Sequence, residues 1–228
     1  MGLRHQLRRY HIWLAWLVGV PLLIWTASGL FMAAFPIETV RGEQLIGKAP
    51  VLALAAPPVP PAIGPRPVAS LSLEQRSDSA RWIVRYADGG ARLADPATGR
   101  LLGPLSAGDA VRIVDTRYTG TAKLASVERT SAARPPLELR REVDAWRVSM
   151  DDGTRFYVDA ATGEIVARRT GLWRLFDIMW GLHIMDLETR EDINNPWLVG
   201  FAAIAVLSLL MALVLLPMAV WKRRRRVR

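Results

Sequence analysis

Two long apolar runs stand near the ends of this chain, and its charged residues lie between and outside them. Residues 12–35 and 197–221 contain no Asp, Glu, Lys, Arg or His. A helix needs about 20 such residues to cross the hydrocarbon core of a bilayer. The pattern therefore predicts transmembrane helices at 12–35 and 196–221, the second opened by a proline, which suits a first helical turn. A simple soluble globule is excluded.

The region between the two runs contains an internal repeat. Residues 82–102 (WIVRYADGGARLADPATGRLL) and 146–166 (WRVSMDDGTRFYVDAATGEIV) align without gaps at an offset of 64, with eight of 21 positions identical. The stretches 71–77 and 124–130 upstream of the two units correspond loosely. Self-similarity of this kind indicates that one supersecondary unit is built twice.

Each repeat unit has the pattern of a β-meander. Trp-x-Val alternates as a strand does, and the Asp-Gly pair that follows is a hairpin signal. A second strand (155–158 in the second unit) leads to Asp-x-Ala-Thr-Gly, where the Asp side chain bonds backbone amides and Gly takes a positive φ. A third short strand ends each unit. The predicted structural turn residues are Asp88, Gly89, Asp95, Gly99, Asp152, Gly153, Asp159 and Gly163.

A helix is predicted between the two units. Ser106 is a good N-cap, the helix runs to about Arg117, and Gly120 closes it. Its apolar side consists of Val111, Ile113, Val114 and Tyr118. Residues 68–171 are then an antiparallel α+β domain, and the fold class is an α+β membrane protein with two transmembrane helices flanking that domain.

Residues 36–67 form a linker whose second half, 50–67, holds seven prolines. This density forbids helix and favours an extended chain. Two arrangements remain open at this stage: a stalk that lifts the domain off the membrane, or a segment that lies along the domain.

Residues 172–188 predict a different kind of element. On a helical wheel Arg174, Asp177 and Gly181 share one side, and the opposite side is apolar and includes Trp180 and His183. An apolar face that carries tryptophan is typical of a helix lying at the membrane interface. We therefore expect an interfacial amphipathic helix before the second span.

The net charge of +9 is explained by the two tails. Residues 1–11 and 222–228 contain nine Lys and Arg, whereas the region between the apolar runs contains 21 Lys and Arg and 21 Asp and Glu. Basic flanks stay on the cytoplasmic side, so both termini are predicted to be cytoplasmic tails and the central domain to lie across the membrane, in the periplasm of a bacterium. A nucleic-acid partner is not expected, because a protein that binds nucleic acid carries its excess positive charge on a folded face, whereas the excess here lies in the two tails.

Two further features limit the function. The first apolar run is longer than the roughly 7–15 residues of a signal-peptide core, so an uncleaved anchor is predicted. The chain has no cysteine, which excludes disulfides, thiolate metal sites, iron–sulfur clusters and c-type haem attachment.

The repeat unit, present twice, resembles the PepSY domain, and the opening of the first span (HIWLAWLVG) is similar to that of PepSY-associated transmembrane helices. The segment WGLHIMD before the second span is similar to a His-bearing stretch of the same family. The resemblance implies two kinds of function. PepSY units are similar to propeptides that inhibit secreted metallopeptidases or assist their folding. The family also includes siderophore-iron reductases that hold haem between histidine-bearing helices, although these usually have more spans.

His11 and His183 are the candidate cofactor ligands. Without cysteine, a haem needs His or Met ligands, and Ala15 and Gly19 would let a flat macrocycle approach the helix that carries His11. At 1.5 Å per residue we expect the two histidines about 30 Å apart, so they cannot share one iron. The haem b hypothesis then requires a local methionine or a homodimer. The alternative is that both are interface residues that contact headgroups or backbone carbonyls.

No catalytic or metal-binding set emerges from the remaining residues. Turn chemistry accounts for the aspartates of the repeats, and the spacing lacks an EF-hand pattern. No hydrolase signature is present. Trp82 and Trp146 are expected to be core anchors, with an exposed aromatic patch for a partner as the alternative.

The sequence thus leads to two hypotheses for function. The first is an inner-membrane protein whose periplasmic domain docks a peptidase or a transport component. The second is electron transfer through b-type haem that supports siderophore-iron reduction or uptake.

Overall fold

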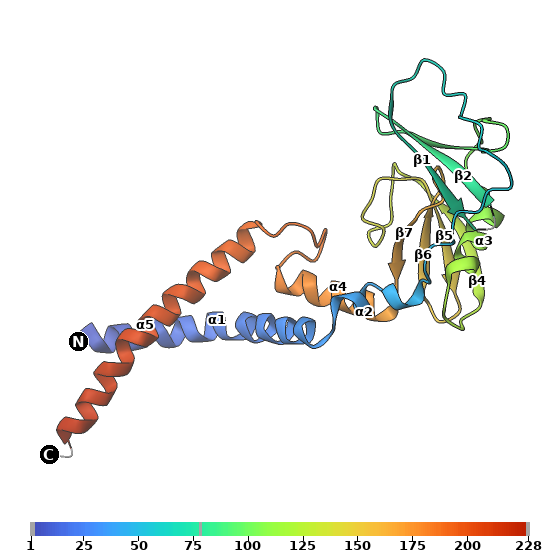
Figure 1. Cartoon of the computed structure of the whole chain (residues 1–228). Coiled ribbons are helices and arrows are strands. Elements are labelled where there is room, and N and C mark those ends of the chain that lie inside the picture. Colours follow the sequence, from blue (N-terminus) through green and yellow to red (C-terminus); the bar gives the residue numbers. More distant parts are fainter. Residues whose placement is uncertain (1–2, 78, 227–228) are drawn as a thin grey trace. The chain divides into compact units, whose positions relative to one another are not determined.

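The computed structural model describes residues 3–77 and 79–226 and divides into two compact units, 1–36 with 175–228, and 37–174 (Figure 1). The side chains of residues 3–5, 7 and 218–226 lie outside the description. The side chains of the predicted basic tail at 222–228 are therefore not described, and neither is that of Arg4.

The first unit contains the apolar helices. Helix α1 spans Leu3–Ala34 and α5 spans Pro196–Arg226. Within them, Arg8–Ala34 and Pro196–Pro217 are long and apolar enough to cross a membrane. The two helices pack on each other, yet most of their large apolar side chains are exposed. Such exposure is what a lipid environment accepts and water does not.

The second unit is α+β. It opens with a helical turn α2 (Ile37–Val40) and a short 3₁₀ turn (Glu43–Leu45). One antiparallel sheet has the order β1-β2-β3 and a second has the order β4-β5-β6-β7. The predicted fold class, two candidate membrane helices flanking an antiparallel α+β region, is confirmed. The strands are β1 Val68–Arg76, β2 Ser79–Tyr86, β3 Ala91–Ala94, β4 Leu124–Thr130, β5 Ala145–Met150, β6 Arg155–Asp159 and β7 Ile165–Arg169.

Helix α3 (Ala107–Arg117) lies between the two sheets in sequence, as predicted. The Ser106 side chain accepts from the Asp109 amide, and the Asp109 carboxylate accepts from the Ser106 amide, a complete capping box. The predicted stop at Gly120 is wrong. Tyr118 ends the helix in an extended conformation, and Gly120 does not take a positive φ.

The main core lies between α3 and one face of the four-stranded sheet. Buried side chains from α3 meet those of β5 and β6, among which Phe156 is fully buried. The opposite face of the sheet carries a smaller cluster around Leu139 and Tyr157, and it is covered by the loop between β4 and β5.

Strand pairing refines the internal repeat. Val68 pairs with Tyr86 and Leu124 pairs with Met150, and each of β1 and β4 has its irregularity at the same place. The counterpart of 124–130 is therefore 68–74, and the loose match to 71–77 seen in the sequence is wrong, because the hydrogen-bond ladder fixes the register. The first unit also lacks its third strand, which is reduced to a single bridge between Ala94 and Leu101.

Part of the proline-rich segment lies along the first sheet. The Val59 amide donates to the Pro96 carbonyl (2.7 Å), and the Ala62 amide donates to the Gly99 carbonyl (2.9 Å). Pro61 is buried. Of the two arrangements left open by the sequence, residues 59–62 adopt the packed one.

Helix α4 spans Gly171–His183 and is shorter than the predicted 172–188. Met185 has a positive φ, so the chain leaves the helix there and Leu187 lies outside it. Asp177 and Gly181, on the side expected to be polar, are buried, whereas Ile178 is exposed. The buried Asp177 carboxylate pairs with Arg190 in the following loop, which explains why it tolerates burial.

Candidate functional site

His183 at the end of α4 packs on α1. Its ring stacks on Trp25 with centroids 4.5 Å apart, and its Nδ1 lies 3.0 Å from the Trp25 carbonyl oxygen and 3.2 Å from the Ser28 hydroxyl. Because a carbonyl oxygen only accepts, this contact places a proton on Nδ1 and leaves the Nε2 lone pair of the neutral ring available. These contacts fix the orientation of the His183 ring. They suit a histidine that packs two helices together as well as one that binds a cofactor through Nε2.

Gly29 belongs to the same contact. A Cβ at this position would approach the His183 Cε1 to 3.0 Å. The glycine therefore allows the imidazole to lie against the helix backbone, which is the role that small residues have where membrane helices meet.

His11 lies in a different environment. It lines an apolar cavity of about 590 Å³ between α1 and α5, together with Val18, Trp25 and Phe201. Its Nδ1 is buried and has no hydrogen-bond partner among the described residues. A buried polar atom without a partner is costly. Within the described parts of α1 and α5, this nitrogen is the one buried side-chain polar atom without a partner.

The two histidines are far apart. His183 contacts α1 at Ser28, and 17 residues separate Ser28 from His11, which is roughly 26 Å along a helix. They therefore do not meet at a single metal. Among the described residues there is no group of three or more His, Cys, Asp or Glu side chains that would hold a metal ion.

The predicted turn residues lie in two pairs of equivalent turns. Asp95 Oδ1 accepts from the Ala97 amide and Asp159 Oδ1 from the Ala161 amide. Gly99 and Gly163 both have φ +70°. In the hairpins, Asp88 and Asp152 accept from the amide two residues on, and Gly89 and Gly153 have positive φ. These carboxylates serve their own turns, and the structure gathers them at no common site.

Trp82 and Trp146 hold equivalent extended segments. The Trp82 indole donates to the Val59 carbonyl (2.9 Å), and the Trp146 indole donates to the Leu105 carbonyl (2.8 Å). The Leu105 amide donates to the Ala160 carbonyl, which matches the Val59–Pro96 bond of the first unit. Both indoles are half-buried and satisfied within the chain, which fits a structural anchor.

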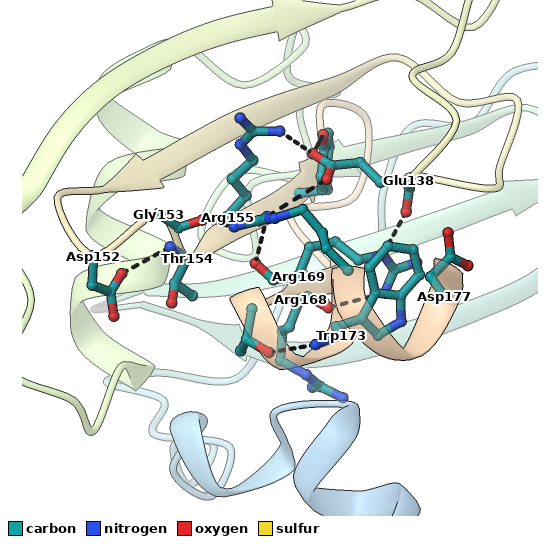
Figure 2. Close-up of polar contacts among 12 residues, drawn as sticks. Glu138, Asp152, Gly153, Thr154, Arg155, Arg168, Arg169, Trp173 and Asp177 are labelled. Carbon is teal, nitrogen blue, oxygen red and sulfur yellow. Dashed lines mark hydrogen bonds and ion pairs between the residues drawn. The ribbon is translucent and has the colours of Figure 1, made fainter. Parts of the chain in front are cut away.

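Glu138 is the centre of a polar cluster that the sequence did not reveal (Figure 2). Its carboxylate accepts from the Tyr157 hydroxyl (2.6 Å) and from Arg155 (2.8 Å), and Arg174 lies 3.7 Å away. The Arg169 side chain donates to the Glu138 backbone carbonyl. Glu138 lies in a loop outside both repeats, so no local pattern indicated it.

The ionisation of this cluster follows from its contacts. Burial raises the pKa of Glu138, but the hydrogen bonds from Tyr157 and Arg155 and the charges of Arg155 and Arg174 outweigh it and hold that pKa below its usual value. Burial and the neighbouring Glu138 carboxylate raise the pKa of Tyr157 from 10.0 to about 12. The cluster is a fixed ion pair at neutral pH. Both carboxylate oxygens of Glu138 face a donor or a positive charge. The residue is therefore suited to holding its loop on the sheet rather than to transferring a proton.

Comparison with known proteins gives one family match. Residues 104–169 match the PepSY family, described as the peptidase propeptide and YPEB domain. The matched region contains the second repeat unit together with α3 and excludes the first unit. Neither a curated protein nor a solved structure matches the chain.

The match falls on the part of the chain in which the meander is covered by its own helix, between two helices that are long and apolar enough to span a bilayer. The chain thus contains a PepSY domain at residues 104–169, in an arrangement compatible with a PepSY-associated transmembrane protein.

Proposed function

We propose that this protein is a membrane-anchored binding module, whose PepSY domain docks and regulates a peptidase or a transport component. The observation that carries the proposal is the match of residues 104–169 to a family described by peptidase propeptides. A propeptide acts by contact with its enzyme and needs no catalytic group. All three histidines of the chain lie outside 37–174.

The proposal includes a location. We place the domain in the periplasm of a bacterial inner membrane, with both termini in the cytoplasm, because basic residues flank both apolar helices on the terminal side. The absence of cysteine allows a clean test. Cysteine introduced as Arg92→Cys should react with a membrane-impermeant maleimide in spheroplasts, whereas Gln6→Cys should react only after lysis. The opposite pattern would overturn this topology.

The partner test uses a photo-reactive amino acid in the full chain in its native membrane. Leu124 is half exposed at the free edge of the four-stranded sheet, and Val51 in the linker is more exposed still. We expect a crosslink to one peptidase or transport component from Leu124 and from other edge positions, and none from Val51. Adding the purified chain should then change the activity of that partner. Crosslinks distributed equally over both positions contradict a specific dock.

A haem-dependent function is the second candidate, and it is favoured by the unpartnered, buried Nδ1 of His11 in an apolar cavity. The fit is incomplete, since His11 is the one His, Met or Cys side chain among the residues that line this cavity. A six-coordinate b-type haem, which would carry one electron in siderophore-iron reduction, therefore requires a second copy of the chain. An absorbance spectrum of protein purified from haem-replete membranes decides the matter. A Soret band that is lost in His11→Ala supports haem binding, and its absence rejects it.

A further inference from the structure

The unit formed by residues 37–174 is basic, although the region between the apolar runs is balanced overall. It contains 20 Lys and Arg and 16 Asp and Glu, and the compensating acids lie in α4 and in the loop after it. The location of the excess positive charge on this unit is therefore informative.

The chain enters and leaves this unit at one end of the four-stranded sheet. Arg168, near the end of β7, donates from Nε to the Arg41 carbonyl (3.3 Å). A Cβ at Gly42 would meet Thr170 at 3.4 Å. Ile37 follows the end of α1 by three positions, and Gly171 opens α4. The end of the sheet that carries Arg41 and Arg168, here called the tethered end, is thus joined by a few residues to α1 on one side and directly to α4 on the other.

Cations without a carboxylate partner gather at the tethered end. Among the described residues, Arg41, Lys48, Arg141 and Arg168 form no ion pair. Arg141 is included because the guanidinium of the preceding Arg140 lies over the Trp173 ring at 5.9 Å, two residues after Gly171. Arg41, Lys48 and Arg141 are exposed. Arg117, at the end of α3, donates to the Gly47 carbonyl, and burial together with the charges of Arg168 and Arg76 lowers its pKa. Arg117 and Arg168, which form no ion pair among the described residues, are therefore like charges held close together.

Arginines away from this end more often have a partner. Arg66 pairs with Asp88, Arg85 with Glu164, and Arg129 with Asp144. Glu138, at the same end, pairs with Arg155 and Arg174. Within the described part of the chain, the other nearby acids form no ion pair with Arg41, Lys48, Arg141 or Arg168; these acids are Glu38, Glu43, Asp151 and Asp152. The Asp151 and Asp152 side chains instead accept from the backbone amides of Lys123 and Thr154.

We propose that the tethered end, through Arg41, Lys48, Arg117, Arg141 and Arg168, binds the phosphates of anionic phospholipid headgroups in the leaflet beside it. Guanidinium groups match phosphate in geometry and charge, and basic segments next to a span are attracted to anionic lipid. Trp173 lies under Arg169 at 4.1 Å, so an amphipathic ring accompanies the cations. This inference goes beyond the docking of a protein partner. It requires that the apolar helices lie in a bilayer and that the tethered end reach the surface of that bilayer.

The test compares the full chain in nanodiscs of phosphatidylcholine alone and of phosphatidylcholine mixed with phosphatidylglycerol. Hydrogen exchange is followed in peptides covering 37–48 and 165–174. We expect exchange to be several-fold slower in the mixed lipid, and the difference to disappear at high salt, which screens charges over a few ångströms. Peptides of the first sheet serve as an internal reference.

Matched variants identify the residues responsible. Arg41→Gln/Arg141→Gln/Arg168→Gln should abolish the lipid-dependent slowing, whereas Arg92→Gln/Arg100→Gln/Arg134→Gln, which removes the same charge elsewhere, should leave it intact. Equal exchange in the two lipids, or equal behaviour of the two variants, would refute headgroup binding. Slowing by inorganic phosphate in phosphatidylcholine discs would instead identify a soluble anion as the ligand. If the first variant fails to fold, the lipid and salt comparison on the unchanged chain decides alone.

Discussion

The two repeat units have the same turns, but different elements of the chain pack over their strands. In the first unit an extended proline-rich segment crosses Trp82 and continues without a helix, whereas in the second the equivalent segment crosses Trp146 and leads into α3. The effect of the covering helix is seen at one pair of equivalent positions, Arg92 and Phe156, which are 64 residues apart. Arg92 is exposed in the first unit, and its counterpart Phe156 is fully buried beneath α3. Turn chemistry specifies the meander, and the covering element decides which of its positions must be apolar.

On the opposite face of the meander the two units differ in polarity rather than in burial. Leu93 in the first unit corresponds to Tyr157 in the second, and both are buried. Tyr157 donates to Glu138, which also pairs with Arg155, because the loop that carries Glu138 covers this face. The same backbone position therefore carries a buried leucine in one unit and a member of an ionic cluster in the other.

The largest expected effect separates the two units at the α3 face. Phe156→Ala should lower the free energy of unfolding by about 3–5 kcal/mol, because it leaves a cavity in the core. Arg92→Ala should change it by no more than about 0.5 kcal/mol, as for an exposed site. Denaturant unfolding of the full chain in detergent, followed by near-UV circular dichroism, measures both. Equal losses would mean that α3 does not create the difference.

The ionic cluster should give the next effect. Glu138→Gln should cost about 2–3 kcal/mol, since it removes the charge that accepts from Arg155 and Tyr157. The half-exposed pair of Glu128 with Arg147 is the control, and Glu128→Gln should cost at most about 1 kcal/mol.

The acid limb of stability tests the same carboxylate. Because the folded-state pKa of Glu138 is lowered, its contribution is present above the unfolded carboxyl pKa of 4.5 and is lost as the pH falls through the lower folded value. Glu138→Gln should flatten this limb of the unfolding curve. If the acid limb is the same in Glu138→Gln as in the unchanged chain, Glu138 does not contribute to the loss of stability at low pH.

A smaller loss is expected at alkaline pH in the second unit alone. The pKa of Tyr157 is raised from 10.0 to about 12, so its contribution is complete below pH 10 and is lost as the pH rises toward 12. Absorbance of tyrosinate should show one late-titrating tyrosine that is missing in Tyr157→Phe. Leu93, its counterpart, has nothing to titrate. A tyrosine titration without a late component contradicts the buried cluster.

The turn glycines should differ in their consequences. Gly99→Ala and Gly163→Ala each cost about 1–2 kcal/mol, because an L-residue is strained at positive φ. A Cβ at Gly99 would also meet the Pro60 carbonyl oxygen at 2.4 Å, whereas at Gly163 the nearest atom is the end of the Ile113 side chain at 3.0 Å. Hydrogen exchange at Val59 and Ala62 should therefore rise in Gly99→Ala only. A similar rise in both variants would argue against the packed proline-rich segment.

The smallest effect concerns the helix that only the second unit has. Ser106→Ala removes the N-cap of α3 and should cost about 1 kcal/mol. Ser70→Ala, on the exposed side of β1, is the control and should be neutral within about 0.5 kcal/mol. Thermal unfolding of the three proteins under one set of conditions is sufficient. No difference between the two variants would mean that the cap does not stabilise α3.

The sequence by itself determined the two apolar helices, the antiparallel repeat, its turns and the capped helix α3. These features depend on residues within a few positions of one another: a run of apolar residues, an Asp-Gly pair, a serine three residues before its partner amide. The wrong stop at Gly120 shows the limit of such signals, because Tyr118 leaves the helix to pack against Phe156 in the core.

Only the tertiary structure decided which distant residues meet. It placed His183 on Trp25 and Ser28, gathered three arginines around Glu138, laid Val59 across Trp82 and brought Arg41 beside Arg168. Each of these contacts depends on which faces pack together and in which register. That choice is made by burial and hydrogen bonding over the whole unit, and it leaves no local pattern in the chain.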